Sequence, residues 1–174
     1  MLSESGTKKG WAVRILALIC VSFLLLFAFI SCKKEYDGRR EYCEIEITLP
    51  EIFSDYDSEG AFDAAYTDGR LIVGIQRLSF DAGLEDGVPA TMTPSVFAEY
   101  YLDRTETDAE VLTHGYVPYA CFSMETSSAS YDYLLSFYRT DYAYFIITFI
   151  AASPMSDNNL DRIFGYVDTV KYNY

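Results

Sequence analysis

The chain has 174 residues, with 13 basic residues against 26 acidic ones and a formal net charge of −13. This length suits one domain with a real hydrophobic core and leaves no comfortable room for a second domain. The negative charge repels phosphate backbones and anionic lipid headgroups, so we expect no nucleic-acid partner and no electrostatic docking to a membrane.

The first 31 residues have the charge and apolar order of a secretory signal peptide. Lys8, Lys9 and Arg14 form a basic start, and an apolar run follows over residues 15–30. A membrane-spanning helix needs about 20 apolar residues, so this run is short for a permanent span. A tilted, uncleaved anchor is the alternative.

The end of the apolar run favours cleavage and lipid attachment. Ser31 precedes Cys32, and charged residues follow at once. This junction resembles the bacterial lipobox, although Phe29 stands where that pattern prefers leucine. The resemblance implies that Cys32 becomes an acylated N-terminus, so that lipid holds the protein at the extracytoplasmic face of the cell membrane. Residues 32–42 are then expected to form a flexible tether, and residues 43–174 a folded domain.

Two cysteines remain after the signal peptide and the lipid site are set aside. Cys43 and Cys121 are an even pair in a compartment that can be oxidising, so a disulfide between them is one interpretation. Two small, unpaired apolar residues are the other. The choice stays open at this stage.

Hydrophobic periodicity predicts mostly strands, with two helices. Residues 43–49 alternate apolar and polar side chains, and Asp68-Gly69 is a strong hairpin signal. Thr93-Pro94 and Ser156-Asp157 can each begin a helix. The expected strands are 43–49, 61–66, 71–80, 111–114, 119–125, 131–140 and 142–151, and the expected helices are 93–103 and 156–170.

An acidic loop over residues 54–60 has carboxylates at several places of a calcium-binding loop. The twelfth place, however, is Tyr66 and not the bidentate glutamate of an EF-hand. A solvated turn is therefore the main interpretation, and a looser calcium site is the alternative.

The element order predicts an α+β fold in which helices flank an antiparallel sheet. From Cys43 to Lys171 the chain resembles the PsbP-like (Mog/DcrB-like) domains. The features are the first strand ending at Leu49-Pro50, the Asp68-Gly69 hairpin, the helix at Pro94, and the turn and strand over residues 115–120. The resemblance implies an α/β/α sandwich, and relatives that bind other proteins without catalysing reactions.

Catalytic motifs are not found in the sequence. The single histidine, His114, lies beside a predicted turn and is expected to be an ordinary surface residue. No phosphate loop, nucleophile elbow or His/Cys metal cluster is present in the sequence. We therefore expect no enzyme and no cofactor.

Tyrosine is the remaining unusual feature, with 16 in the chain. Strand propensity explains most of them, but an exposed tyrosine also suits a binding surface. Tyr116 and Tyr119, beside the turn at Gly115, are the preferred candidates. The predicted function is a lipid-anchored, non-catalytic module that binds or assembles an envelope protein. The alternative is a lipoprotein that binds a small ligand, either a glycan or a cation.

Overall fold

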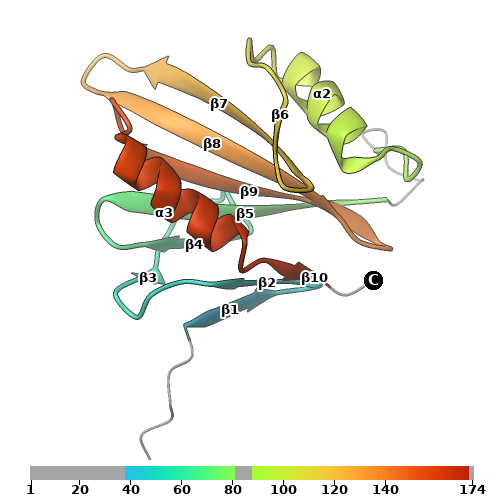
Figure 1. Ribbon diagram of the computed structural model, residues 1–174, viewed down its shortest axis with the longest axis horizontal. Helices are drawn as coiled ribbons and strands as arrows, with labels where there is room; N and C mark the ends of the chain where they lie inside the picture. The colour runs from blue at the N-terminus through green and yellow to red at the C-terminus, as the bar shows by residue number, and fades with distance from the viewer. Residues whose placement is uncertain (1–37, 81–87, 173–174) are drawn as a thin grey trace, which may run out of the picture. The chain divides into compact units, whose positions relative to one another are not determined.

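The computed structural model describes residues 38–80 and 88–172, and Figure 1 shows their arrangement. The strands and helices are β1 (Arg39–Tyr42), β2 (Ile45–Thr48), β3 (Ser54–Asp55), β4 (Ala64–Thr67), β5 (Leu71–Ser79), α2 (Pro94–Arg104), β6 (Leu112–His114), β7 (Val117–Glu125), β8 (Ser130–Arg139), β9 (Ala143–Ala152), α3 (Asp157–Val167) and β10 (Lys171–Tyr172).

The strands of the described residues form two antiparallel sheets. The larger has the order β3-β4-β5-β9-β8-β7-β6, and the smaller has the order β1-β2-β10. The long strand β9 lies near the middle of the larger sheet and pairs with β5 and β8 over nearly its whole length. Its run of apolar residues on both faces is explained by this central position.

Each face of β9 contributes to a separate hydrophobic core. On one face, Phe145, Ile147 and Phe149 pack with residues of α3 and of the small sheet. On the other face, Tyr144 and Ile146 pack with residues of α2. The large sheet is therefore a central layer with α2 on one side, and α3 and the small sheet on the other. The α+β class, with helices flanking an antiparallel sheet, is confirmed.

Both helices begin where the sequence predicts. The side chain of Thr93 accepts a hydrogen bond from the backbone of Val96, and that of Ser156 accepts one from Asn159. These N-caps satisfy backbone donors that a helix leaves free in its first turn. Helix α3 ends at Val167, however, three residues before the apolar repeat does.

Three short strands were not expected from the sequence. The last four residues of the predicted tether form β1, which pairs with β2. Arg39 lies opposite Thr48, and Tyr42 lies opposite Ile45. Strand β3 falls in the predicted acidic turn, and β10 follows α3. The predicted first strand is also shorter than expected, since Cys43 has a φ of 52° in the turn between β1 and β2.

The helices of the described residues are too short to cross a membrane. The apolar run over residues 15–30 and the proposed lipid site at Cys32 lie outside the described residues.

Candidate functional site

The β6–β7 hairpin presents Tyr116 entirely to solvent, with a side-chain exposure of 103%. Strands β6 and β7 pair from His114–Val117 to Leu112–Tyr119, which leaves the two-residue turn Gly115-Tyr116. Gly115 has a φ of 60°, a left-handed conformation that glycine adopts readily at this turn position. Tyr116 therefore stands at the tip of a tight hairpin.

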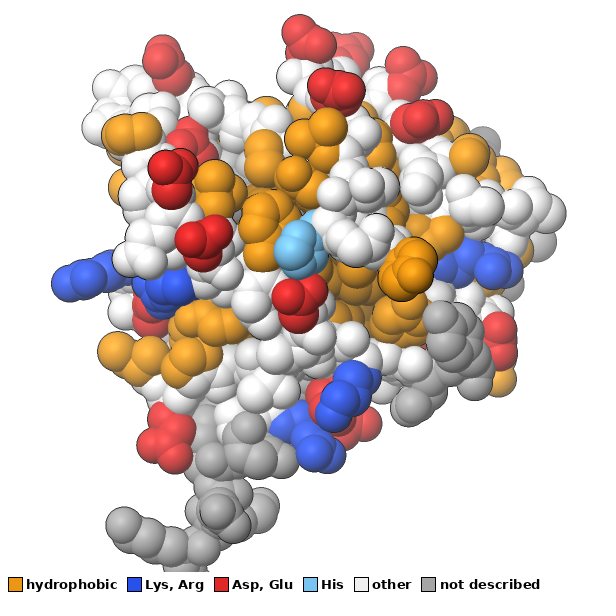
Figure 2. Space-filling model, viewed as in Figure 1, with side chains coloured by type: hydrophobic (Ala, Val, Ile, Leu, Met, Phe, Trp, Pro, Cys, Tyr) orange, Lys and Arg blue, Asp and Glu red, His pale blue; other side chains and the backbone are white. Residues whose placement is uncertain are grey.

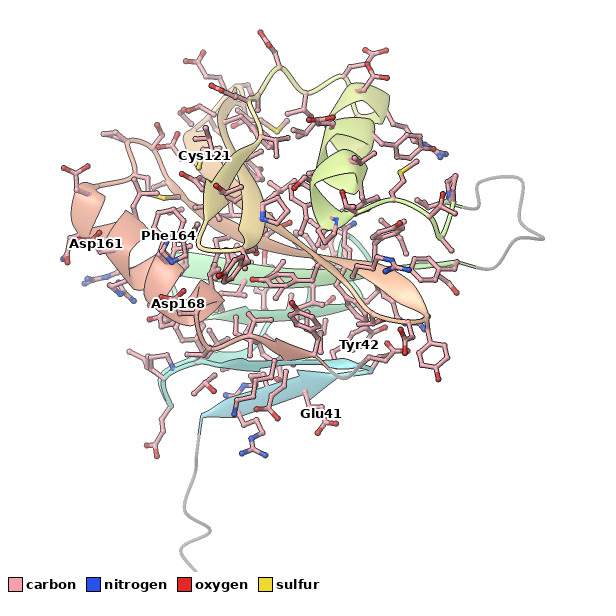
Figure 3. The ribbon with its side chains drawn as sticks, turned by 45° about the vertical axis from the view of Figure 1, so that its right-hand side comes forward. Glu41, Tyr42, Cys121, Asp161, Phe164 and Asp168 are labelled. Carbon is pink, nitrogen blue, oxygen red and sulfur yellow. The ribbon has the colours of Figure 1, made fainter. Side chains whose placement is uncertain are left out.

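Helix α3 holds this hairpin in place through Phe164 and Asp168. The His114 ring stacks on the ring of Phe164, with centroids 4.3 Å apart, and the Tyr119 ring meets Phe164 edge-on at 5.1 Å. His114 Nε2 also lies 2.9 Å from Asp168 Oδ1. Figure 3 labels Phe164 and Asp168 in this C-terminal part of α3. The hairpin that carries Tyr116 is thus fixed on one side.

The structure separates the two tyrosines that the sequence groups together. Tyr116 is fully exposed, whereas Tyr119 is half-buried and packs on the core that α3 covers. Of the two, Tyr116 is therefore the more accessible, and a binding surface formed by both tyrosines stays a prediction. His114 is not an ordinary loop residue, because it belongs to β6 and contacts α3.

A second exposed tyrosine lies at the same end of the sheet. Because β7 and β8 are antiparallel, the β6–β7 and β8–β9 turns emerge at the same end of the sheet. Tyr142 lies in the β8–β9 turn with 63% of its side chain exposed. We call Tyr116 and Tyr142 the tyrosine tips. The two residues are far apart in the chain, and only the strand order of the folded sheet brings their turns to the same end. Sequence patterns alone therefore could not group them.

Hydrophobic side chains flank the histidine on the face drawn in Figure 2, an acidic side chain lies directly below it, and other acidic side chains are spread over the face. Exposed aromatic residues beside apolar side chains are typical of protein interfaces.

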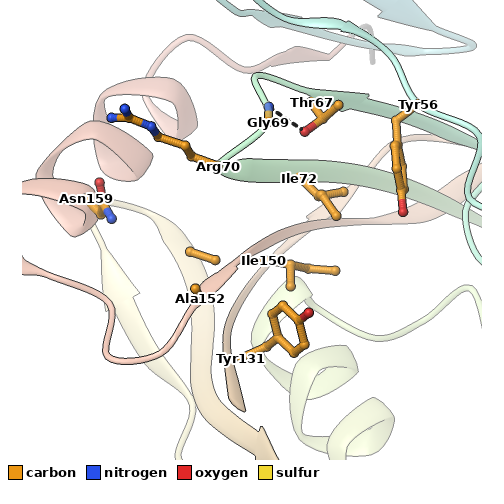
Figure 4. A pocket seen from close by; sticks show the side chains of 10 residues that line it. Tyr56, Thr67, Gly69, Arg70, Ile72, Tyr131, Ile150, Ala152 and Asn159 are labelled. Carbon is orange, nitrogen blue, oxygen red and sulfur yellow. Dashed lines mark hydrogen bonds between the residues drawn. The ribbon is translucent and has the colours of Figure 1, made fainter. Parts of the chain in front are cut away.

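A separate hollow of about 610 Å³ lies over β4, β5 and β9. Figure 4 shows the rings of Tyr56 and Tyr131, with Ile72 and Ile150 between them, and Arg70 toward Asn159 of α3. The lining residues are Tyr56, Thr67, Gly69, Arg70, Ile72, Tyr131, Ile150, Ala151, Ala152 and Asn159.

Asp68, at the turn beside this hollow, is committed to structural contacts. Burial alone would raise the pKa of its carboxyl. Hydrogen bonds from the backbone of Leu71 and Arg70, together with the guanidinium of Arg162 at 3.2 Å, outweigh burial and lower that pKa. Asp68 therefore stays ionised and linked to α3, and it is not an available acid.

The two remaining cysteines are both free thiols. Cys43 lies in the turn between β1 and β2, and Cys121 lies in β7. Figure 3 shows Tyr42, the neighbour of Cys43, well apart from Cys121. The pKa of the Cys121 thiol is raised to about 11, mainly by loss of hydration and to a smaller extent by the nearby negative charge of Asp132. The structure does not bring the two thiols together.

The acidic residues of the 54–60 loop, for which a calcium site was the alternative interpretation, do not converge on one point. Asp55 lies in β3, and an Asp57 side-chain oxygen accepts a hydrogen bond from the backbone of Glu59 in a turn. Within residues 38–80 and 88–172, no group of three or more His, Cys, Asp or Glu side chains is placed to hold a metal ion.

No protein-family model and no curated protein sequence matches the chain. Among solved structures, a protein of Bacteroides thetaiotaomicron VPI-5482 is similar, with a TM-score of 0.53 and 11% identity. The match covers 75% of this chain and 46% of that one, so the chain spans less than half of the Bacteroides protein. At this identity the likeness extends to the fold alone.

Cyanobacterial PsbP (CyanoP) of Synechocystis sp. PCC 6803 is also among the structural neighbours. Its TM-score is 0.47 and its identity 10%, over 78% of this chain and 91% of that one.

Proposed function

We propose that this protein is a lipid-anchored, extracytoplasmic binding module that holds an envelope protein without catalysing a reaction. The observation that carries the proposal is the pair of tyrosine tips on one end of the sheet. Tyr116 is fully exposed on a hairpin fixed to α3, and Tyr142 is exposed on a neighbouring turn.

Exposed aromatic residues on a fixed backbone suit protein recognition. Tyrosine is enriched among the interface residues that dominate binding energy, and it loses little conformational entropy because it has two side-chain torsions. A hairpin held by His114 and Tyr119 is ordered before binding, which lowers the entropic cost of association. These features support binding and require no catalytic group.

The location rests on the N-terminal pattern. Basic residues, an apolar run and Ser31-Cys32 support export and acylation at Cys32. We expect the intact mass of the protein extracted from its host's membranes to correspond to a chain that begins at Cys32 and carries acyl groups. An unacylated chain beginning at Met1 would contradict the lipoprotein proposal.

The protein-binding proposal is tested by placing a photo-crosslinking amino acid at position 116 or 142 in cells of the host. We expect both positions to capture the same envelope protein. Position 52 is the matched control, because Ile52 is an apolar residue 69% exposed in the loop between β2 and β3. Equal capture from all three positions, or none from 116 and 142, would contradict a binding surface at the tyrosine tips.

A further inference from the structure

The hollow over β4, β5 and β9 lies on the side of the large sheet that α2 covers only in part. Helix α2 packs against β7 and β8. Thr67 of β4 pairs with Ile72, and Ile72 pairs with Ile150, so these three residues form one cross-strand row on one face. The row continues the α2 face of β9 beyond the helix. The floor of the hollow is therefore ordered sheet.

The charge of this hollow differs from that of the protein as a whole. The chain has 26 acidic residues and 13 basic ones, yet no carboxylate is among the described residues that line the hollow, whereas Arg70 is. The nearest acid in the turn, Asp68, is held by Arg162 and by backbone donors. An anion can therefore approach Arg70 without meeting a lining carboxylate.

Arg70 is also the one basic side chain, within the described ranges, for which the structure has no hydrogen bond or ion pair. The others contact acidic side chains, a tyrosine hydroxyl or backbone carbonyl groups. A guanidinium presents a fork of donors that matches a carboxylate, and such charge-assisted pairs are stronger than neutral hydrogen bonds.

The rest of the lining suits sugar rings. Tyr56 and Tyr131 are 42% and 37% exposed, and Ile72 and Ile150 provide an apolar floor between them. A pyranose ring has faces of C–H groups and a rim of hydroxyls, so it can lie against tyrosine rings and apolar residues while its hydroxyls reach polar tips. Asn159 adds an amide at the end near Arg70.

We propose that this hollow binds a short acidic saccharide, with the carboxylate of a uronic acid at Arg70 and the sugar rings against Tyr56 and Tyr131. Its volume of about 610 Å³ lies within the range of roughly 300–1,000 Å³ typical of small-ligand sites. This site gives a ligand class to the small-ligand alternative and does not depend on the tyrosine tips.

The test uses digalacturonic acid as the probe and its uncharged methyl ester as the matched ligand. Calorimetric titration of the full chain in detergent, at low salt, measures Kd for both. We expect the acid to bind in or below the millimolar range. Arg70→Gln should weaken binding of the acid about tenfold or more and leave binding of the ester unchanged.

Two further variants separate the contacts from general effects of charge. Tyr56→Ala should weaken binding of both ligands, since stacking does not depend on the carboxylate. Arg104→Gln, which removes a cation from α2 and not from the hollow, should leave both affinities unchanged. The proposal is overturned if wild type does not bind the acid, if Arg70→Gln binds it as wild type does, or if Arg104→Gln weakens it equally.

Discussion

His114 Nε2 lies 2.9 Å from Asp168 Oδ1, and this contact joins the third residue of β6 to the residue that caps α3. The two residues are 54 positions apart in the chain. Together with the stacking of His114 on Phe164, the contact connects the hairpin that carries Tyr116 to the helix on the same side of the sheet.

Replacing His114 with Ala should loosen this hairpin. The variant loses one hydrogen bond and a ring stack at a partly exposed site, so we expect the free energy of unfolding to fall by about 1 kcal/mol. Urea titration measures this fall, and amide hydrogen exchange should accelerate in β6. Thr113→Ala, an exposed neighbour in the same strand, is the control. Equal exchange rates in the two variants would show that α3 does not hold the hairpin.

Tyr119→Ala and Tyr116→Ala should have opposite consequences. Tyr119 packs on Phe164 at the edge of the core, so its loss should lower the free energy of unfolding by about 2 kcal/mol. Tyr116 contacts solvent, and its loss should change that free energy by no more than about 0.5 kcal/mol. Urea titration of the two variants checks this. Similar destabilisation by both would contradict the observed orientations.

Gly74 leaves no room for a larger side chain, because the Phe62 ring lies directly on it. A Cβ at position 74 would come within 2.5 Å of the Phe62 ring. Gly74→Ala should therefore lower the free energy of unfolding by about 1–3 kcal/mol, the range for overpacked sites. Combining it with Phe62→Ala should recover part of the loss, so the two effects should be non-additive in a double-mutant cycle. Simple addition would show that the ring moves away freely.

The ion pair of Glu44 and Arg77 should make stability depend on pH. The Arg77 guanidinium, 2.9 Å from Glu44, lowers the pKa of that carboxyl below its ordinary value of 4.5. A pKa lowered by folding adds stability that is complete above the ordinary value and is lost as the pH falls through the folded value. Glu44→Gln should thus cost up to about 1 kcal/mol at pH 7 and less at pH 3. Urea titrations at both pH values measure this, with exposed Glu125→Gln as the control; a cost independent of pH would contradict it.

The two thiols should react at different rates. Both thiols are exposed, but at pH 8 a maleimide should label Cys43 first, because the raised pKa of Cys121 leaves that thiol little thiolate. Peptide mapping without reductant distinguishes these sites from the other cysteines of the chain. Failure to label either residue until reductant is added would instead favour a disulfide between them.

Local patterns predicted much of the fold. The alternation before Leu49, the Asp68-Gly69 turn and the caps at Thr93 and Ser156 each act within a few residues, so each could be recognised directly. Strand β10 has two residues, and its pairing of Lys171 with Glu46 arises from tertiary contact. Strand β1 begins with charged residues, which suit an exposed edge but lack an apolar pattern.

The candidate sites were harder to predict than the fold, because they depend on the order of strands in the sheet. A position beside the Gly115 turn correctly predicted exposure for Tyr116, but the inward orientation of Tyr119 depends on Phe164 of α3. The tyrosine tips and the hollow over β4, β5 and β9 unite residues from separate strands. Their proximity follows from the strand order, which no local pattern encodes.

Strand β2 is bordered by β1, the first strand of the described domain, and by β10, its last. While a new chain is being delivered from its N-terminus, β10 is the last of these strands to arrive. Until then, the backbone donors and acceptors along one edge of β2 have no strand partner. The small sheet is therefore the final part of the domain to close, and an interrupted chain would expose that edge to neighbouring molecules.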